Sequence, residues 1–344
     1  MNKKLITGGC GFLGSNLAQD AVESGDEVYI LDNLQRAGSR INLEWLQSKY
    51  DINFIHGDVR DHQQVETAIR AIQPDFVYHL AGQVAMTTSI ANPFLDLQIN
   101  VNGTVNILEA IRKYSNETAL IYSSTNKVYG DLEQFKYTEG KTRYHCVEHP
   151  LGFDENTQIC FHSPYGCSKG AADQYVLDYA RIYGLRTTVF RHSSMYGGRQ
   201  FATFDQGWVG WFCEQALSQK RSPIANKFTI AGNGKQVRDL LHATDMKNLY
   251  KVASHEIDNI SGQAFNIGGG YDNSMSLLEL FAALEDFLNI KLQYEKTNVR
   301  KSDQKIFIAD TKKINDAIGW APTVSSKTGV SLMLDWLEQQ YRSI

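Results

Sequence analysis

The sequence lacks the features that mark secreted, membrane-spanning or modular proteins. Its 344 residues contain only six prolines, and no proline-, glycine- or serine-rich linker separates two parts of the chain. The five cysteines are odd in number and never occur as Cys-x-x-Cys, so a disulfide framework is not predicted and a reducing compartment is expected. No run approaches the roughly 18 apolar residues of a membrane span. Glycines interrupt the first apolar run, which is too short for a signal peptide. We therefore expect a cytoplasmic protein.

Strong charge of either sign is also absent. The formal net charge is −4 and 21% of residues are charged, which is ordinary for a globular protein. Such a balance gives no general attraction to nucleic acid or to an anionic membrane, so neither is an expected partner. Cys146 lies close to His145 and His149, but the wider ligand spacing of a metal site is missing, and no metal is predicted.

The first half of the chain alternates short apolar runs with helical patterns. Continuous apolar strands separated by helices are typical of a parallel sheet covered on both faces. Right-handed crossovers then give an α/β, Rossmann-type doubly wound fold. The expected strands are 4–9, 27–32, 53–58, 75–82, 119–124 and 186–193, and the expected helices are 12–24, 62–72, 94–114 and 164–184.

The second half of the chain has a different pattern. Residues 131–163 show little periodicity, and a loop of that length is usually functional or disordered. After Tyr196 short strands at 227–232, 264–269 and 305–310 stand between helices. We expect a dinucleotide-binding domain at 1–195 and a smaller mixed α/β lobe at 196–344, with some chain crossing and a cleft between them.

Three glycines follow the first predicted strand and precede a helix. Gly8, Gly11 and Gly14 form Gly-x-x-Gly-x-x-Gly, which lets the backbone approach a pyrophosphate at the helix N-terminus. Asp32 ends the second strand, where an acid accepts hydrogen bonds from a ribose diol and repels a 2′-phosphate. The pattern predicts NAD. Arg36, which could hold a 2′-phosphate, keeps NADP as the alternative.

Tyr165 and Lys169 are four residues apart on a predicted helix, and therefore share one face. An ammonium group near a phenol lowers its pKa, so that a phenolate can act as a base near neutral pH. Because the pair follows a dinucleotide-binding pattern and the strand-ending "SST" of residues 123–125, we interpret it as catalytic.

Several motifs together resemble the extended short-chain dehydrogenase/reductase family of nucleotide-sugar enzymes. They are the glycine triplet, "DNL" at 32–34, "HLAG" at 79–82, "SSTNKVYG" at 123–130, "YGCSK" at 165–169, "YGGRQ" at 196–200 and "GNGKQVRDLLHATD" at 232–245. The resemblance covers nearly the whole chain. It implies that Tyr165 is the catalytic base and acid, that Thr125 assists it, and that Lys169 holds the nicotinamide ribose.

The same resemblance implies the ligand-binding residues. Those expected to contact NAD are Gly8, Gly11, Phe12, Leu13, Gly14, Asp32, Asn33, Arg36, Asp58, Val59, Leu80, Ala81, Gly82, Gln83, Asn100, Ser123, Tyr165, Lys169 and His192. Asp58 is expected to meet the adenine. Those expected to contact the nucleotide sugar are Ser124, Thr125, Asn126, Lys127, Ser194, Arg199, Gln200, Arg238 and Arg300. The resemblance implies that the last two, Arg238 and Arg300, hold its diphosphate. Ser194 stands where many relatives have asparagine, which puts the usual contact there in doubt.

Asn126 and Lys127 separate two enzyme types within the family. The 4,6-dehydratases follow the threonine with Asp-Glu, because elimination of water needs a general acid and a base. An amide cannot titrate, and an amine is a poor substitute for a carboxylic acid. A dehydratase is therefore disfavoured, and redox at a carbinol remains. The two side chains could bind sugar hydroxyls instead.

Long stretches, such as "LAGQVAMTTSI" and "FRHSSMYGGRQFAT", resemble the family's epimerases that act at C2 of a CDP-linked dideoxy sugar. The resemblance implies conversion of CDP-paratose to CDP-tyvelose through a 2-keto sugar, a CDP-sugar substrate, a tetramer and a role in O-antigen biosynthesis. Two alternatives stay open at this point. One is a 4-epimerase or reductase of the same fold, and the other is a regulatory protein that senses NAD(H) without chemistry.

Overall fold

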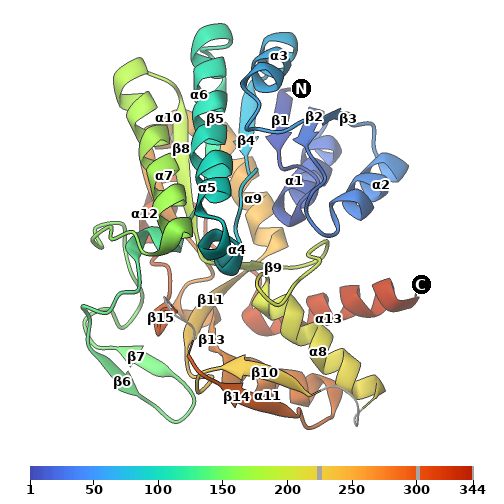
Figure 1. The fold of residues 1–344 in the computed structure, drawn as a ribbon, viewed down its shortest axis with the longest axis vertical. Coiled ribbons are helices and arrows are strands. Elements are labelled where there is room, and N and C mark those ends of the chain that lie inside the picture. Colours follow the sequence, from blue (N-terminus) through green and yellow to red (C-terminus); the bar gives the residue numbers. More distant parts are fainter. Residues whose placement is uncertain (223–226, 300–302, 343–344) are drawn as a thin grey trace.

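A seven-stranded parallel sheet forms the upper part of the molecule in the computed structural model, which describes residues 1–222, 227–299 and 303–342 (Figure 1). The strand order is β12-β8-β5-β4-β1-β2-β3. The strands are β1 (Lys3–Thr7), β2 (Glu27–Asp32), β3 (Asn53–His56), β4 (Phe76–His79), β5 (Ala119–Thr125), β8 (Thr187–His192) and β12 (Gln263–Ile267). The predicted Rossmann-type fold is confirmed.

Helices cover both faces of this sheet. The helices α1 (Phe12–Glu23), α2 (Ser39–Lys49) and α9 (Ala243–His255) bury apolar residues such as Leu17, Leu46 and Leu249 against one face. On the other face lie α3 (His62–Ile72), α6 (Gly103–Tyr114) and α7 (Ser163–Tyr183), with buried residues such as Ile69 and Ile107. Each fully buried large aliphatic side chain contributes about 1.5–3 kcal/mol, so the sheet is held from both sides. The carboxyl ends of the strands are thereby fixed in one row.

A helix extends over the predicted range 94–114, but it contains a π-helical turn. The chain forms α4 (Met86–Ala91), then α5 (Pro93–Leu97), a π-helical turn at Gln98–Asn102, and only then α6. The side chain of Asn92 caps α5 by accepting a hydrogen bond of 3.1 Å from the Leu95 amide. Extra residues in a helical turn are frequent at functional sites, because they re-aim a side chain. Here the π-helical turn carries Asn100.

The lower part of the molecule in Figure 1 is a smaller mixed lobe. Its strands are β9 (Ser194–Tyr196), β10 (Phe228–Ala231), β11 (Val237–His242), β13 (Ser274–Ser276), β14 (Tyr294–Thr297) and β15 (Ile306–Phe307), and its helices are α8 (Trp208–Arg221), α11 (Leu277–Leu288) and α13 (Ser326–Arg342). The strands predicted at 227–232 and 305–310 correspond to β10 and β15. The predicted strand at 264–269 corresponds to β12, which pairs with β8 in the large sheet. The domain boundary at residue 196 therefore stays a prediction.

Helix α2 and a hairpin in the segment 131–163 are among the elements that the sequence did not predict. Helix α2 has few apolar residues, and its N-terminal Gly38 has a left-handed φ of 82°. The segment 131–163 contains a hairpin of β6 (Tyr137–Glu139) and β7 (Tyr144–Cys146), which contacts the lower lobe. None of the helices in the described residues could span a bilayer.

Candidate active site

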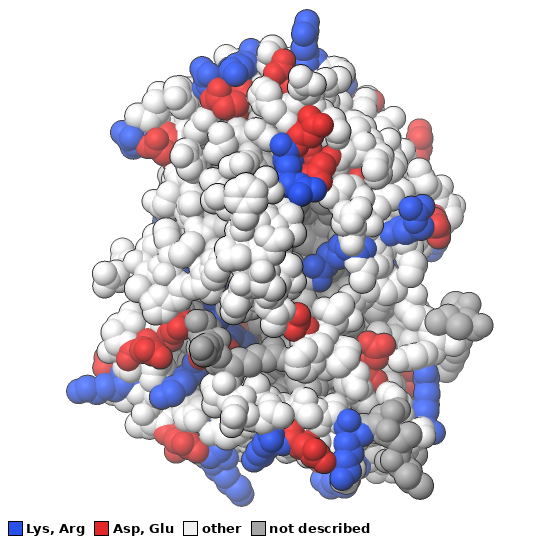
Figure 2. Space-filling view, in the orientation of Figure 1, with Lys and Arg blue, Asp and Glu red and all other residues white. Residues whose placement is uncertain are grey.

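A groove of about 560 Å³ runs along the carboxyl ends of the large sheet, and a second cavity of about 430 Å³ continues it beside β3. Figure 2 shows this face of the molecule hollowed between the upper and lower parts, with Lys or Arg side chains at the margin of the hollow. Most residues predicted to contact NAD line the groove. They are Gly8, Gly11, Phe12, Leu13, Gly14, Asp32, Asn33, Arg36, Asp58, Val59, Leu80, Ala81, Gly82, Gln83 and Ser123.

The glycine turn has no room for side chains. Gly8 has a φ of +69°, and a Cβ atom there would lie 2.8 Å from the Ala81 nitrogen. A Cβ atom on Gly14 would lie 2.3 Å from the Gly8 oxygen. No side chain caps the N-terminus of α1, so its first amide groups remain available to an anion. This floor fits a pyrophosphate.

Asp32 is held at the end of β2 by backbone donors. Its carboxylate accepts hydrogen bonds from the Cys10 amide at 3.0 Å and the Leu34 amide at 2.8 Å. Burial raises the pKa of Asp32, while these two bonds lower it. The carboxylate is fixed in the groove wall, where a ribose diol would find an acceptor.

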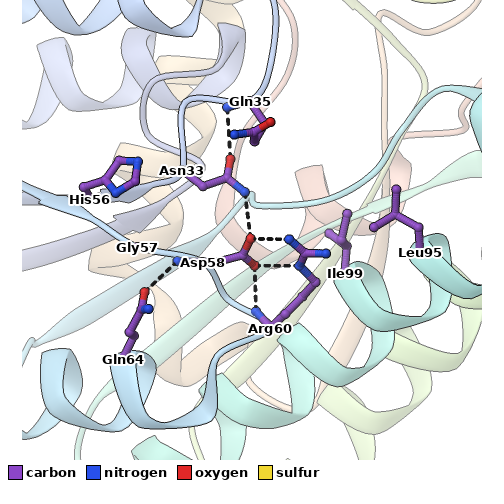
Figure 3. Close-up of a pocket in the computed structure, with 9 residues that line it drawn as sticks. All are labelled: Asn33, Gln35, His56, Gly57, Asp58, Arg60, Gln64, Leu95 and Ile99. Carbon is purple, nitrogen blue, oxygen red and sulfur yellow. Dashed lines mark hydrogen bonds and ion pairs between the residues drawn. The ribbon is translucent and has the colours of Figure 1, made fainter.

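Asp58 is the centre of the second cavity (Figure 3). Arg60 donates to its two oxygens at 3.0 and 2.7 Å, and Asn33 donates at 2.9 Å. The bond from Arg60 is the largest of the effects that lower the pKa of Asp58 to about 2. Asp58 is therefore an anion at neutral pH, in a cavity also lined by Leu95 and Ile99. A carboxylate beside apolar walls suits a flat ring with an exocyclic amine, which agrees with the predicted adenine contact.

Thr125, Tyr165 and Lys169 come together from β5 and α7. The Thr125 side chain acts on the Tyr165 hydroxyl and lowers the pKa of Tyr165. The positive charge of Arg36 acts in the same direction. Burial outweighs both and raises the pKa of Tyr165 to about 12. The prediction that a neighbouring ammonium lowers this pKa is therefore wrong for this structure.

The ammonium of Lys169 lies beneath the groove floor. Its Nζ atom donates to the main-chain oxygen of Ser123 at 2.5 Å and lies 4.2 Å from the centre of the Tyr122 ring. Burial lowers the pKa of Lys169 to about 7, although Asp173 and Asp96 oppose this. Burial therefore favours the neutral amine of Lys169, and the two acids near it favour the ammonium.

The other two predicted cofactor residues adjoin this set. Asn100 accepts a hydrogen bond from the Gln83 amide at 2.9 Å. His192 lies opposite Thr125 in the parallel pairing of β5 and β8, and its Nε2 is 3.3 Å from the Tyr250 hydroxyl. Burial lowers the pKa of His192 to about 3, so the ring is neutral. Both residues support the groove from inside the fold.

The predicted sugar-binding residues after Ser123 have different surroundings. Ser124 donates to Asp173 at 2.8 Å, and Asn126 donates to Gln304 at 2.9 Å, so both side chains are engaged within the protein. Lys127 is partly buried. Burial, with a smaller contribution from Arg238, lowers its pKa to about 8. Its role as a sugar ligand, like that of Asn126, stays a prediction.

The "YGGRQ" segment packs against the protein more than against the groove. The guanidinium of Arg199 lies 3.9 Å from the centre of the Trp45 ring on α2, a cation–π contact. Gln200 is buried and donates to the Met195 oxygen at 3.1 Å. Ser194 accepts a hydrogen bond of 3.0 Å from the Trp208 ring. Their roles as substrate ligands stay predictions.

Of the two arginines predicted to hold a diphosphate, one is described. Arg238 on β11 forms an ion pair of 2.8 Å with Asp303 and also donates to its neighbour's main-chain oxygen at 2.7 Å. The charge of Arg238 lowers the pKa of Lys127, which shows that the two basic side chains lie near each other. Arg300 lies outside the described residues.

The groove also has a wall that the sequence did not indicate. Thr203, Asp205 and Gln206 line it from the segment that precedes α8, and Thr87 of α4 donates a hydrogen bond to Asp205. No motif spacing marks these residues. In the described ranges 1–222, 227–299 and 303–342, no group of three or more His, Cys, Asp or Glu side chains could hold a metal ion.

Comparison with known proteins places this geometry among nucleotide-sugar enzymes. The CDP-paratose 2-epimerase of Salmonella typhi is 61% identical over 97% of this chain and 98% of its own. The structure of UDP-glucose 4-epimerase from Thermotoga maritima with UDP-glucose matches with a TM-score of 0.84 and 28% identity, over 98% of this chain and 99% of that one. The enzyme of the same name from Thermus thermophilus, in complex with NAD, matches with a TM-score of 0.81 and 27% identity, over the same shares.

These matches confirm the resemblance to nucleotide-sugar epimerases. A further match extends over residues 5–333, which is nearly the whole chain. The protein belongs to the family described as GDP-mannose 4,6 dehydratase.

Proposed function

We propose that this protein is an NAD-dependent epimerase that inverts C2 of a CDP-linked dideoxy sugar and converts CDP-paratose to CDP-tyvelose. The observation that carries the proposal is the 61% identity with the Salmonella typhi CDP-paratose 2-epimerase, which extends over 97% of the chain. A 4-epimerase is the second candidate, because the structural relatives with UDP-glucose and NAD carry that name at 27–28% identity.

The groove supports NAD as the cofactor. The glycine floor leaves the amides of α1 free for a pyrophosphate, and Asp32 offers an acceptor where a 2′-phosphate would meet a negative charge. When bound, NAD supplies the hydride acceptor and donor that oxidation and reduction of a carbinol need. Arg36 lines the same groove, but its charge also reaches Tyr165. We therefore assign Arg36 to the nicotinamide side and not to a 2′-phosphate.

Tyr165 is the residue proposed to move the proton. Its phenolate oxygen takes the proton of the C2 hydroxyl as the sugar becomes a 2-keto sugar, and the phenol so formed returns that proton after the sugar has presented its other face. The Thr125 side chain and the Arg36 charge favour the phenolate, although burial disfavours it more strongly. Arg238, near Lys127, holds the diphosphate while the pyranose turns about its bond to the phosphate.

Elimination of water is disfavoured, although the family is described by a dehydratase. Asn126 cannot titrate, and its amide is bound to Gln304. Lys127, with its pKa lowered to about 8, is a base or a cation but not a carboxylic acid. The chain therefore has no acid pair after Thr125, and reversible oxidation is the chemistry that its residues serve.

The test uses CDP-paratose that carries deuterium at C2, in ordinary water. Epimerisation by hydride removal and return keeps the deuterium at C2 of CDP-tyvelose, as read by NMR of the product. Loss of deuterium to solvent would contradict the mechanism. Inversion at C4 with C2 untouched would replace the proposal with the 4-epimerase, and turnover of no CDP- or UDP-sugar would favour a sensor of NAD(H).

A tetramer, a cytoplasmic location and a role in O-antigen biosynthesis accompany this proposal. They rest on the similarity to the Salmonella typhi epimerase. Sedimentation of the purified protein tests the assembly.

A further inference from the structure

A carboxylate that no sequence motif marks lies beside the catalytic pair. Asp96 on α5 is fully buried. It accepts a hydrogen bond of 2.9 Å from the Gln83 side chain and another from the Ser168 hydroxyl. Ser168 directly precedes Lys169, and its hydroxyl also bonds to the main-chain oxygen of Tyr165 at 3.2 Å. Asp96 thus contacts both a groove-lining residue and the helix that carries the catalytic pair.

Asn100 completes this buried network. Its side-chain nitrogen donates to the Ser168 hydroxyl at 2.9 Å and to the main-chain oxygen of Gln83 at 3.0 Å. Its side-chain oxygen accepts a hydrogen bond from the main-chain amide of Gln83. Gln83 and Gly82, which line the groove, are therefore tied to α7 through Asp96 and Asn100. Because each of the four residues in this network is hydrogen-bonded to two of the others, displacement of one disturbs the groove wall and the catalytic helix together.

The charge of Asp96 has no bonded counter-ion. Its hydrogen-bond donors are a hydroxyl and an amide, and no Lys, Arg or His in the described part of the chain forms an ion pair with it. A buried charge is costly unless another charge compensates it. Burial raises the pKa of Asp96, whereas its hydrogen bonds from Ser168 and Gln83 and the charge of Lys169 lower it.

Asp173, the second acid near Lys169, already has a counter-ion. Asp173 receives two hydrogen bonds of 2.9 Å from Arg191 and one of 2.8 Å from Ser124. Its charge is matched within that buried pair. Asp173 raises the pKa of Lys169 more than Asp96 does, but among the described residues Asp96 is the one of these two acids that has no ion pair.

We propose that Asp96 is a positioning residue for the epimerisation: its hydrogen bonds hold Gln83 and Ser168 in place at the groove, and its carboxylate favours the charged form of Lys169 without forming an ion pair with it. The inference rests on the proposed function for its activity readout. It assigns Asp96 no contact with substrate or cofactor. Its effect reaches the reaction through Lys169 and Tyr165.

The titratable groups around the pair set the expected direction. From α7 come Tyr165, Lys169 and Asp173; from the other elements come Arg36, His79, Tyr122, Arg191 and His192. Burial, followed by Lys169, lowers the pKa of each histidine to about 3, so both are neutral. Asp96 raises the pKa of Tyr165 and of Lys169. Removal of its charge lowers both, so both limbs of the pH profile move toward lower pH.

Asp96→Asn, which keeps the shape of the side chain, tests the charge. We expect the kcat profile of the variant to move toward lower pH by about one unit, the shift that a nearby charge typically gives. Ser168→Ala is the matched control, because it removes a bond to Asp96 but leaves the carboxylate. It is expected to lower kcat without moving the profile. An Asp96→Asn profile that coincides with the parent's would overturn the proposal.

A second measurement separates this inference from the proposed function. The ultraviolet absorbance of phenolate, taken as a difference against Tyr165→Phe, titrates Tyr165 without any substrate. The midpoint in Asp96→Asn is expected below that in the parent protein. Equal midpoints would refute the role of Asp96 even in an active epimerase. A lowered midpoint in a protein that turns over no CDP-sugar would retain it and remove the proposed function.

Discussion

The side-chain nitrogen of Asn126 lies 2.9 Å from the side-chain oxygen of Gln304, and this contact joins the end of β5 to the C-terminal part of the chain. Gln304 is fully buried and uses its own nitrogen to donate to the Gly130 oxygen at 2.6 Å. The orientations of both side-chain amides are therefore fixed, and the Gln304 side-chain oxygen is the acceptor that faces residue 126. An amide suits this position because it can donate, which an ionised carboxylate cannot do.

The first prediction concerns Asn126→Asp. The new carboxylate would face the Gln304 oxygen and lose the hydrogen bond, which leaves a buried acceptor unsatisfied. We expect a loss of about 1–3 kcal/mol in the free energy of unfolding and no dehydratase activity. Urea unfolding at neutral pH measures the loss, with Asn116→Asp at an exposed site as the control. Equal unfolding midpoints for the two variants would refute the structural role of Asn126.

The second prediction concerns the phenol of Tyr165. Tyr165→Phe keeps the ring but removes the hydroxyl that Thr125 contacts. Activity should fall about 10²–10⁴-fold, the usual contribution of a general acid or base. NAD affinity and the unfolding midpoint should change little. Near-parental activity would remove Tyr165 from its proposed role.

The third prediction concerns cofactor choice at Asp32. Asp32→Ala should weaken NAD binding, because the ribose loses an acceptor, and should narrow the preference over NADP, because the repulsion of a 2′-phosphate disappears. Asp32 also accepts the Cys10 and Leu34 amides, so the variant's melting temperature is measured alongside. Titration with each dinucleotide gives the ratio of affinities. An unchanged ratio, or NADP(H) extracted from the native protein, would contradict the assignment.

Local spacing explains which parts of the site the sequence revealed. Gly8, Gly11 and Gly14 lie within one turn, and Tyr165 and Lys169 lie on one helical face, so short patterns were sufficient to predict them. The sheet followed from continuous apolar strands. The helix at 94–114 was predicted without its π-helical turn, because hydrophobic periodicity does not register one added residue.

The supporting contacts could not be read in the same way. Asp96 and Ser168 are 72 residues apart in the sequence, and Asn126 and Gln304 are 178 apart, so no local pattern contains both partners of either contact. The pKa of Tyr165 also depended on burial, which the spacing to Lys169 does not report. Arg199 was expected at the substrate by resemblance, yet its guanidinium contacts Trp45. These features are properties of the packed fold.

The last prediction concerns acid stability and the buried His79. The Thr104 hydroxyl donates its one proton to the main-chain oxygen of Asn100 at 2.6 Å. Toward His79 Nε2, 3.0 Å away, this hydroxyl can therefore only accept a hydrogen bond. The other ring nitrogen then accepts from Thr7 at 2.7 Å. The neutral ring is satisfied on both sides, and a proton on Nδ1 would face a donor.

Burial lowers the pKa of His79 in the folded protein to about 3, from an ordinary value of 6.5. Between these values the unfolded chain binds a proton that the folded chain refuses, so stability falls as the pH falls from 6.5 toward 3. The slope for one such histidine is at most about 1.4 kcal/mol per pH unit. His192 adds a similar slope, whereas Asp239, whose pKa burial raises to about 6, contributes with the opposite sign.

The measured quantity is therefore a difference between variants. His79→Gln should be less stable than the parent near pH 7, since it disturbs the two threonine contacts, but its free energy of unfolding should fall less steeply between about pH 6.5 and pH 5. His145→Gln, at an exposed position, is the control and should keep the parental slope. Urea unfolding across this range gives both slopes. If His79→Gln retains the full parental slope, then His79 does not resist protonation in the folded protein, and the acid sensitivity has another source.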